Sequence, residues 1–331
     1  MDDAIGGYFG LEPLNQTGEE FHRGVVRVQS ARAALLTALG QAKVSRIWLP
    51  WYICDCIPAV VAAKKIEIAR YRLNSLFDLP DIALGENDFL LYVNYFGLCS
   101  RQSRDMVTRY SSQVILDASQ AFFYRPPSPT SITIYSPRKF FGIPDGGYLF
   151  PAPALLPEFP ADPGSVKRST HLLQRFAGDV VTGYERFRDA EASLNTNEIL
   201  SMSALTRTML RRIDYAGAAQ RRQENFAFLH GHLGKYNLLS EMIKFTRDDV
   251  PLCYPLLLTR PVRDLRSLLS NERIFVPTYW PELALALPPD ASGEKQWFDH
   301  LLPVPCDQRY VPAQLQRMVE LIVTALGKKR D

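Results

Sequence analysis

The sequence predicts an α/β protein whose mostly parallel sheet lies between helices. Between residues 30 and 150, short β-type runs alternate with helix-length amphipathic stretches, which is typical of a parallel sheet covered on both faces. The 331 residues are 47% apolar and 22% charged, so the chain can bury a full core and is not a disordered protein. This length suits two domains, or one large domain with a smaller appendage.

The first half of the chain supplies the elements of this sheet in order. Residues 31–39 have the composition of a helix, and Gly40 is predicted to end it in a left-handed conformation. We then expect strands at 46–49, 66–71, 89–93 and 114–116, with helices at 53–63 and 100–110 between them. The last of these strands would deliver Asp117 to its carboxyl end, where open α/β sheets place their ligands.

The second half begins with a proline-rich connection and continues as a helical region. Five prolines between residues 151 and 163 interrupt regular structure, because proline lacks an amide donor and disfavours helix for the residue before it. Residues 166–233 are predicted to be helical, followed by strands near 254–258 and 273–276 and a last helix at 312–325. We therefore predict a large cofactor-binding domain over 1–215 and a smaller C-terminal α/β domain over 216–331.

The charge and hydropathy of the chain exclude several classes of protein. The formal net charge of +3 gives little positive field for binding polyphosphate, so we do not expect a nucleic acid partner. The acidic amino terminus lacks an apolar signal segment, and the most apolar tract, 47–63, is broken by two prolines and an aspartate. We expect no membrane association and a place in the reducing cytoplasm.

The five cysteines predict neither a disulfide scaffold nor a metal site. Their number is odd, and only Cys54 and Cys56 lie close together in the sequence. No second cysteine pair or histidine cluster accompanies them to complete a tetrahedral zinc site. We therefore interpret the thiols as buried side chains and predict no metal.

A lysine in an apolar segment is the first candidate for chemistry. A strand-like run leads to Ser136 and Lys139, and a glycine pair follows at 146–147, where the backbone can approach a ligand closely. Aromatic and apolar neighbours would desolvate the Lys139 ammonium, lower its pKa and leave a nucleophilic amine that can form a Schiff base. The alternative is an ordinary lysine whose ammonium reaches solvent.

Asp117 strengthens the case for a cofactor site. A carboxylate at the end of a buried strand needs a cationic or hydrogen-bonding partner, and a protonated pyridine nitrogen is one such partner. Pyridoxal phosphate enzymes require a lysine for the aldehyde, a carboxylate for the ring nitrogen and donors for the phosphate. The strand followed by Asp117 and Gln120, with Ser136 and Lys139 downstream, provides each of these groups, although a buried aspartate alone is more often a turn or capping residue.

These segments resemble the DegT/StrS-type sugar aminotransferases, a family of fold type I pyridoxal phosphate enzymes. The resemblance runs nearly end to end and includes the segments at 5–12, 30–35, 49–54, 93–97, 114–121, 133–148 and 302–305. It implies the fold type I architecture, with a mostly parallel mixed sheet in the large domain and a smaller C-terminal domain. It also implies pyridoxal 5'-phosphate as the cofactor and an active site at a homodimer interface.

The resemblance assigns a role to each matched residue. Lys139 would bind the cofactor aldehyde and then move a proton, Asp117 would pair with the pyridine N–H, and Gln120 would lie near the ring substituents. Ser136 would donate its hydroxyl to the phosphate. The phosphate would also be bound by the start of the first helix, at Ser30, Ala31 and Arg32.

Some positions depart from the pattern of the family. The threonine hydroxyl that many members have at the phosphate helix is missing, so Arg32 must compensate for it. The residue that often stacks on the cofactor ring is Cys54 here, which leaves Tyr52 or the Cys54 thiol to cover the ring. Asn195 and Asn197 stand where a loop would reach the cofactor of the partner subunit, and each could instead be a helix cap or turn residue.

The resemblance implies an aminotransferase that moves an amino group from an amino acid, glutamate by analogy, to a nucleotide-linked keto-sugar. Such an enzyme would serve surface polysaccharide or related sugar biosynthesis. One alternative is a catalytically silent binding or scaffold protein with the same fold. Another is a pyridoxal phosphate-dependent sugar dehydratase, in which a histidine replaces the lysine, and the presence of Lys139 argues against it.

Overall fold

A computed structural model describes residues 5–10, 18–128, 131–243 and 249–327. Its largest sheet consists of β2 (Val26–Val28), β3 (Arg46–Pro50), β4 (Glu67–Tyr71), β5 (Asp88–Val93), β6 (Val114–Ala118), β7 (Ile132–Tyr135) and β8 (Gly147–Phe150). The strand order is β2-β8-β7-β6-β5-β3-β4. Neighbours from β7 to β4 are parallel, whereas β8 is antiparallel to β7 and β2 is antiparallel to β8. The predicted α/β class, with a mostly parallel mixed sheet, is confirmed.

The helices of the first half pack against this sheet. They are α1 (Ala31–Gln41), α2 (Cys56–Ala63) and α3 (Ser100–Tyr110), with short 3-10 helices η1 (Tyr95–Gly97), η2 (Ser111–Gln113) and η3 (Pro137–Lys139) between elements. Helix α1 contacts β7 and β8, and α3 contacts β5 and β6. The central strands are almost fully buried, including Leu90, Ile115 and Ile134, so continuous apolar runs identify strands that are covered on both faces.

Two helix boundaries in the first half of the chain differ from the sequence prediction. Helix α1 continues through Gly40 to Gln41, because the Ala42 amide still donates to the Ala38 carbonyl and completes the last turn. Helix α2 begins at Cys56 rather than at residue 53. The Trp51 amide donates to the Tyr71 carbonyl at 3.1 Å, which keeps the chain extended beside β4 and delays the helix.

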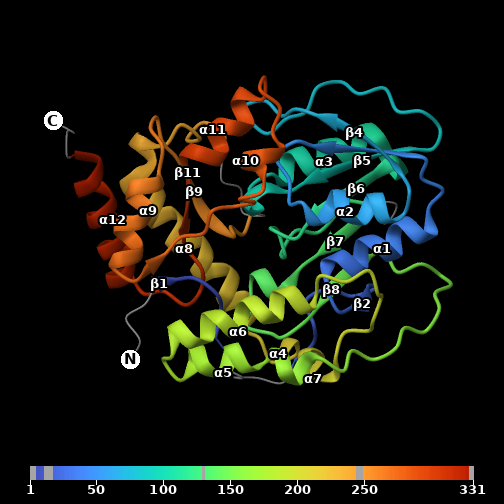
Figure 1. Cartoon of the computed structure of the whole chain (residues 1–331), viewed down its shortest axis with the longest axis horizontal. Helices are drawn as coiled ribbons and strands as arrows, with labels where there is room; N and C mark the ends of the chain where they lie inside the picture. The colour runs from blue at the N-terminus through green and yellow to red at the C-terminus, as the bar shows by residue number, and fades with distance from the viewer. Residues whose placement is uncertain (1–4, 11–17, 129–130, 244–248, 328–331) are drawn as a thin grey trace.

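The predicted helical middle consists of five helices with an extended break. These are α4 (Ser165–Arg168), α5 (Thr170–Phe176), α6 (Val180–Ser193), α7 (Ala204–Leu210) and α8 (Tyr215–Leu233). Figure 1 shows α4 to α7 gathered on one side of the molecule. Between α6 and α7, the Leu200 amide donates to the side-chain oxygen of Gln29 at 2.8 Å, and the Gln29 side-chain nitrogen donates to the Glu198 carbonyl. This extended stretch is thereby fixed next to the start of α1.

The C-terminal part forms a smaller unit with two short sheets. Its elements are η4 (Gly234–Tyr236), β9 (Cys253–Leu257), α9 (Arg263–Asn271), β10 (Ile274–Phe275), α10 (Leu283–Ala286), α11 (Ser292–His300), β11 (Leu301–Pro305) and α12 (Pro312–Gly327). Strand β9 is antiparallel to β11, and α12 packs on α8 and α9 (Figure 1). The first strand, β1 (Ile5–Gly6), is parallel to β10, so the start of the chain joins this unit. The domain boundary at 215/216 stays a prediction.

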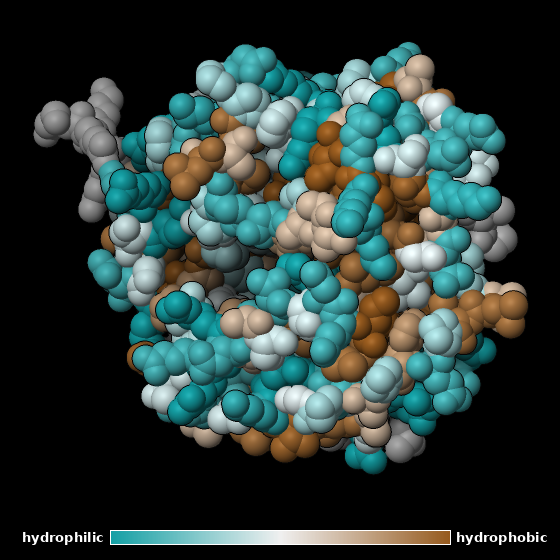
Figure 2. All heavy atoms as spheres, turned by 45° about the vertical axis from the view of Figure 1, so that its right-hand side comes forward, coloured by the Kyte–Doolittle hydropathy of each residue, from teal (hydrophilic) through white to brown (hydrophobic). Residues whose placement is uncertain are grey.

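Hydrophilic side chains and some large hydrophobic ones, such as Leu155, Phe176 and Leu285, are exposed at the surface. Figure 2 shows one face on which hydrophilic side chains predominate and hydrophobic patches lie between them. Among the helices of the described ranges, none has both the length and the apolar composition that crossing a membrane requires.

His22 is buried as a neutral side chain, which predicts a pH-dependent stability. Its Nε2 lies 2.6 Å from the carbonyl oxygen of Phe122, and burial lowers the pKa of His22 from its usual 6.5 to about 4. In the unfolded chain the same group would bind a proton near pH 6.5. The stability contributed by the neutral imidazole is therefore complete above pH 6.5 and is lost as the pH falls towards 4.

We expect the contribution of His22 to the free energy of unfolding to decrease by about 2 kcal/mol when the pH is lowered from 7 to 5. Urea unfolding at both pH values would measure the effect. Because other groups also titrate in this range, the readout is the difference between the wild type and His22→Gln, whose stability should fall less. Equal decreases in the two proteins would show that His22 is not responsible.

Candidate active site

A cavity of about 380 Å³ lies at the carboxyl ends of β5, β6 and β7. Nine of the residues predicted from the sequence line it: Ser30, Ala31, Arg32, Cys54, Asp117, Gln120, Ser136, Lys139 and Asn195. They come from separate parts of the sequence and meet because parallel strands end at the same edge of the sheet. The cavity therefore brings together a lysine, a carboxylate and a helix amino terminus.

Asp117 is held rigidly at the end of β6. It is 6% exposed, and the Ser119 amide donates to its Oδ1 at 2.8 Å, as does the Ser119 hydroxyl. The Asn94 amide donates to the backbone carbonyl of Asp117 at 3.0 Å. Neither Ser119 bond uses Oδ2, so this oxygen is the acceptor that the carboxylate can offer to a ligand.

The orientation of Gln120 is set by the loop after β5. The Phe96 amide donates to Gln120 Oε1 at 2.8 Å, and Phe96 and Gly97 have positive φ values of 57° and 72°. With Oε1 occupied by the backbone, the side-chain NH₂ of Gln120 is the group available as a donor. The side chain is 2% exposed and lines the cavity.

The amino terminus of α1 also lines the cavity and could bind an anion there. Ser30 is the N-cap residue, and its Oγ accepts a hydrogen bond from the Ala33 amide at 3.1 Å. The first amides of a helix have no partner inside the helix and bind anions well, with support from the helix dipole. Arg32 adds a guanidinium at the cavity wall. These donors fit a phosphate group, and Asp117 fits a protonated ring nitrogen.

Gly147 allows this helix to approach the sheet. A Cβ atom at this position would lie 2.2 Å from the carbonyl carbon and oxygen of Ser30 and 2.6 Å from the Ala31 amide nitrogen. Each of these neighbours is backbone, so the contact cannot be relieved by turning a side chain.

Gly147→Ala is therefore expected to displace the start of α1. We expect a loss of about 1–3 kcal/mol of stability, the usual cost of overpacking a core, together with weaker binding of a phosphate-bearing ligand. Thermal unfolding and the dissociation constant for pyridoxal phosphate would measure the two effects. Gly231→Ala is the matched control, because a Cβ there would meet nothing within 4 Å. Unchanged binding and stability in Gly147→Ala would contradict the close contact.

Lys139 lies at the open side of the cavity and is exposed in the single chain. The turn η3 places Phe140 and Phe141 in the core, with no exposed surface, and directs the lysine outward. The expectation of an ammonium desolvated by these aromatic neighbours is therefore wrong. The aromatic residues fix the backbone of the turn instead, and the Lys139 amide donates to the Ser136 carbonyl at 3.2 Å.

A buried arginine of α8 holds the same turn. Arg222 in α8 has no exposed surface, and its Nη2 donates to the Phe140 carbonyl at 3.2 Å. Its guanidinium carbon lies 4.5 Å from the centre of the Phe140 ring. Gln308 Nε2 donates to the same carbonyl at 2.8 Å. Residues beyond 215 therefore hold the residue next to Lys139 in place.

The structure does not bring Tyr52 into the cavity. Its ring is 1% exposed and packs edge-on against Trp280 with the ring centres 4.7 Å apart. Trp280 lines the cavity and Tyr52 does not, because burial among aromatic rings draws Tyr52 into the core. The sequence analysis did not predict Trp280, which lies far from the motifs in the chain. Cys54, the other candidate to cover the cofactor ring, does line the cavity.

The two asparagines also differ in position. Asn195 lines the cavity of its own chain, just after the end of α6. Asn197 is exposed and does not line the cavity. Contact of either residue with a partner subunit stays a prediction. Two further unpredicted cavity residues, Arg138 and Glu191, form an ion pair with each other.

Known structures with this fold are numerous, although the sequence has diverged. No known protein family profile matches the chain, and no curated protein matches it. The sugar aminotransferase CalS13 from Micromonospora echinospora is 16% identical, with a TM-score of 0.59 over 91% of this chain and 87% of that one. A DegT DnrJ EryC1 StrS aminotransferase from Brucella abortus is 14% identical, with a TM-score of 0.64 over 92% and 86%.

NtdA from Bacillus subtilis, solved with bound cofactor PMP, is 15% identical, with a TM-score of 0.63 over 92% of this chain and 74% of that one. The chain has the fold of these aminotransferases. The implied fold type I architecture is thus confirmed, and identities of 14–16% leave the activity to be argued from the site.

Proposed function

We propose that this protein is a pyridoxal phosphate-dependent sugar aminotransferase. The observation that carries the proposal is the single cavity that joins Lys139, Asp117, Ser136 and the amino terminus of α1. An amine, a fixed carboxylate and a phosphate-binding helix are the three groups that this cofactor requires. The structures named above as aminotransferases, one of them with bound PMP, support the same class.

In this proposal the residues of the chain have separate roles. The phosphate is bound by the first amides of α1, the guanidinium of Arg32 and the hydroxyl of Ser136. Asp117 accepts a hydrogen bond from the pyridine N–H and keeps that nitrogen protonated. Lys139 would hold the aldehyde carbon of the cofactor through its Nζ and, after the amine of the substrate has displaced it, the free Nζ would carry the proton that leaves the substrate α-carbon. Bound pyridoxal phosphate supplies the electron sink for this proton transfer.

We further propose the substrates and the assembly. The donor is an amino acid, with glutamate as the first candidate, and the acceptor is a nucleotide-linked keto-sugar of surface polysaccharide or related sugar biosynthesis. The enzyme acts as a homodimer in the cytoplasm. Support for the sugar comes from the names of the structural neighbours, and the open cavity beside Lys139 leaves room for a second subunit or a substrate to cover the lysine.

A two-stage assay tests this function. The protein is loaded with pyridoxal phosphate, desalted and mixed with individual amino acids, and the visible absorbance of the bound cofactor is followed. A donor should bleach this absorbance, and a nucleotide-linked keto-sugar should restore it while an aminated sugar appears by mass spectrometry. Retention of cofactor without any response to amino acids would favour the scaffold alternative. Formation of a deoxygenated rather than an aminated sugar would favour the dehydratase alternative.

A further inference from the structure

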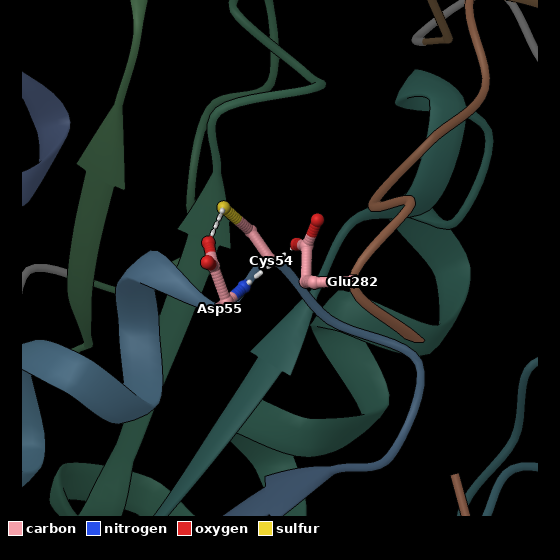
Figure 3. Close-up of side chains that lie close together, drawn as sticks. All are labelled: Cys54, Asp55 and Glu282. Atoms are coloured by element: carbon pink, nitrogen blue, oxygen red, sulfur yellow. Dashed lines mark hydrogen bonds between the residues drawn. The ribbon is translucent and has the colours of Figure 1, made fainter. Parts of the chain in front are cut away.

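Two cysteines and two carboxylates meet at the rim of the cavity. The Sγ atoms of Cys54 and Cys56 are 2.8 Å apart, and Cys54 Sγ is 3.7 Å from Oδ1 of Asp55. Glu282 Oε1 accepts a hydrogen bond from the Asp55 amide at 3.1 Å. Candidate ligand atoms of Cys54, Asp55 and Glu282 all lie within 4.8 Å of one another. Figure 3 shows the Asp55 and Glu282 side chains on either side of Cys54.

Folding brings a further candidate ligand, Glu282, next to the cysteine pair, although it lies far from the pair in the sequence. Cys54 and Asp55 lie in the loop after β3, Cys56 begins α2, and Glu282 lies 227 residues further along the chain than Asp55, just before α10. The sequence alone gave no metal site because the cysteine pair had no partner nearby. The other three cysteines, Cys99, Cys253 and Cys306, are buried, whereas Cys54 and Cys56 are partly exposed.

We propose that Cys54, Cys56, Asp55 and Glu282 bind a divalent cation of the Zn²⁺ class. Cys54, Asp55 and Glu282 supply the three ligand atoms that already lie close together, and Cys56, whose Sγ lies beside that of Cys54, would have to turn its side chain to supply the fourth. Two thiolates and two carboxylate oxygens suit a borderline-soft ion without a strict geometric preference. With Zn–S near 2.3 Å and Zn–O near 2.0 Å, tetrahedral ligand atoms stand about 3.3–3.8 Å apart. The Asp55 oxygen is already at this distance from Cys54 Sγ, and the two Sγ atoms must separate by about 1 Å.

The local charges are compatible with a bound cation. Two thiolates and two carboxylates carry four negative charges, which one divalent ion offsets by half. Lys139 and Arg32 line the same cavity and compensate for part of the remainder.

A cation at this position would connect two parts of the chain. Glu282 follows Trp280, which lines the cavity, and it faces the first residues of α2 through Asp55. Binding would therefore fix the segment that carries Trp280 at the rim of the cavity. Of the four proposed ligands only Cys54 is also a candidate for the cofactor site, and cation binding can be measured on the cofactor-free protein, so its test is separate from that of the proposed activity.

Cadmium titration of the reduced, cofactor-free protein tests the site, because Cd²⁺ bound to thiolates absorbs in the near ultraviolet. Under anaerobic conditions with a non-thiol reductant, we expect one Cd²⁺ per chain and displacement by Zn²⁺. Cys54→Ser and Cys56→Ser should each lose most of the absorbance. Glu282→Gln should retain the band but bind at least tenfold more weakly, since removal of even an outer partner of a ligand costs about 10–100-fold.

Two variants provide controls for the titration. Asp290→Asn removes a carboxylate that pairs with Arg72 outside the cluster, and Cys253→Ala removes a buried thiol, so both should bind Cd²⁺ as the wild type does. Thermal unfolding without metal confirms that each variant is folded. The proposal is overturned if the band survives in both Cys54→Ser and Cys56→Ser. It is also overturned if Glu282→Gln binds Cd²⁺ as tightly as the wild type, or if the reduced protein binds none.

Discussion

Replacing Lys139 with alanine is expected to abolish covalent attachment of pyridoxal phosphate and to lower amino transfer by at least about 10³-fold. Lys139 is the one lysine among the residues that line the described cavity. The neighbouring arginines cannot replace it, because a guanidinium stays protonated and is not a nucleophile at neutral pH. Borohydride reduction followed by peptide mass spectrometry would show the cofactor on residue 139 of the wild type and on no residue of Lys139→Ala.

The exposure of Lys139 makes this variant a clean test of chemistry. Its side chain is exposed in the single chain, so removal should leave the unfolding temperature nearly unchanged. Lys64→Ala is the matched control, because Lys64 is also exposed but lies at the far end of α2. The control should retain the covalent cofactor. A reduced cofactor adduct of normal yield in Lys139→Ala would refute the assignment of the lysine.

The sequence could predict the elements that carry the site because their patterns are local. The apolar run before Asp117 is continuous, as expected for a strand covered on both faces, and β6 does deliver this carboxylate to the cavity. The helix that begins at Ala31 is likewise determined by neighbouring residues. In these cases backbone hydrogen bonding and strand burial determine where the element begins and ends, so the residue types of a short segment are sufficient to predict it.

Features that depend on tertiary contacts could not be predicted in this way. Trp280, Glu282 and Arg222 reach the site or its rim from the C-terminal part, and nothing in their own neighbourhoods indicates this. Tyr52 is the opposite case: it lies near the motif in the sequence and was expected to cover the cofactor ring, but its ring is buried against other aromatic rings. The apolar residues after Lys139 predicted a buried amine, yet a single turn separates the buried rings from the exposed lysine.

The two parts of the molecule therefore contribute differently to the site. The large sheet supplies the groups assigned to the cofactor, and the C-terminal part determines how the turn at Lys139 and the rim at Trp280 are held. Arg222 and Gln308 both donate to the Phe140 carbonyl, so residues far along the chain hold the backbone of the lysine turn. Helix α8 thereby supports the backbone next to Lys139, although it contributes no residue to the lining of the cavity.

Asp117→Asn should separate the electronic role of the carboxylate from its structural role. Asparagine retains an Oδ1 atom that can accept the hydrogen bonds from the Ser119 amide and hydroxyl, so the fold and the cavity should be preserved. The negative charge that keeps the pyridine nitrogen protonated is lost. We expect cofactor binding to persist while the rate of the half-reaction with the amino-acid donor falls by about 10²–10⁴-fold, as measured by stopped-flow absorbance.

Asp145→Asn is the matched control for this prediction. Asp145 has no exposed surface, accepts hydrogen bonds from the Ser203 amide and hydroxyl at 3.1 and 2.7 Å, and does not line the cavity. Its burial raises its pKa, so the substitution removes a buried carboxylate that has no part in the proposed chemistry. This control should change the unfolding temperature but leave the half-reaction rate within about threefold of the wild type. If Asp117→Asn reacted as fast as this control, the carboxylate at 117 would have only a structural role, and the pairing with the ring nitrogen would be wrong.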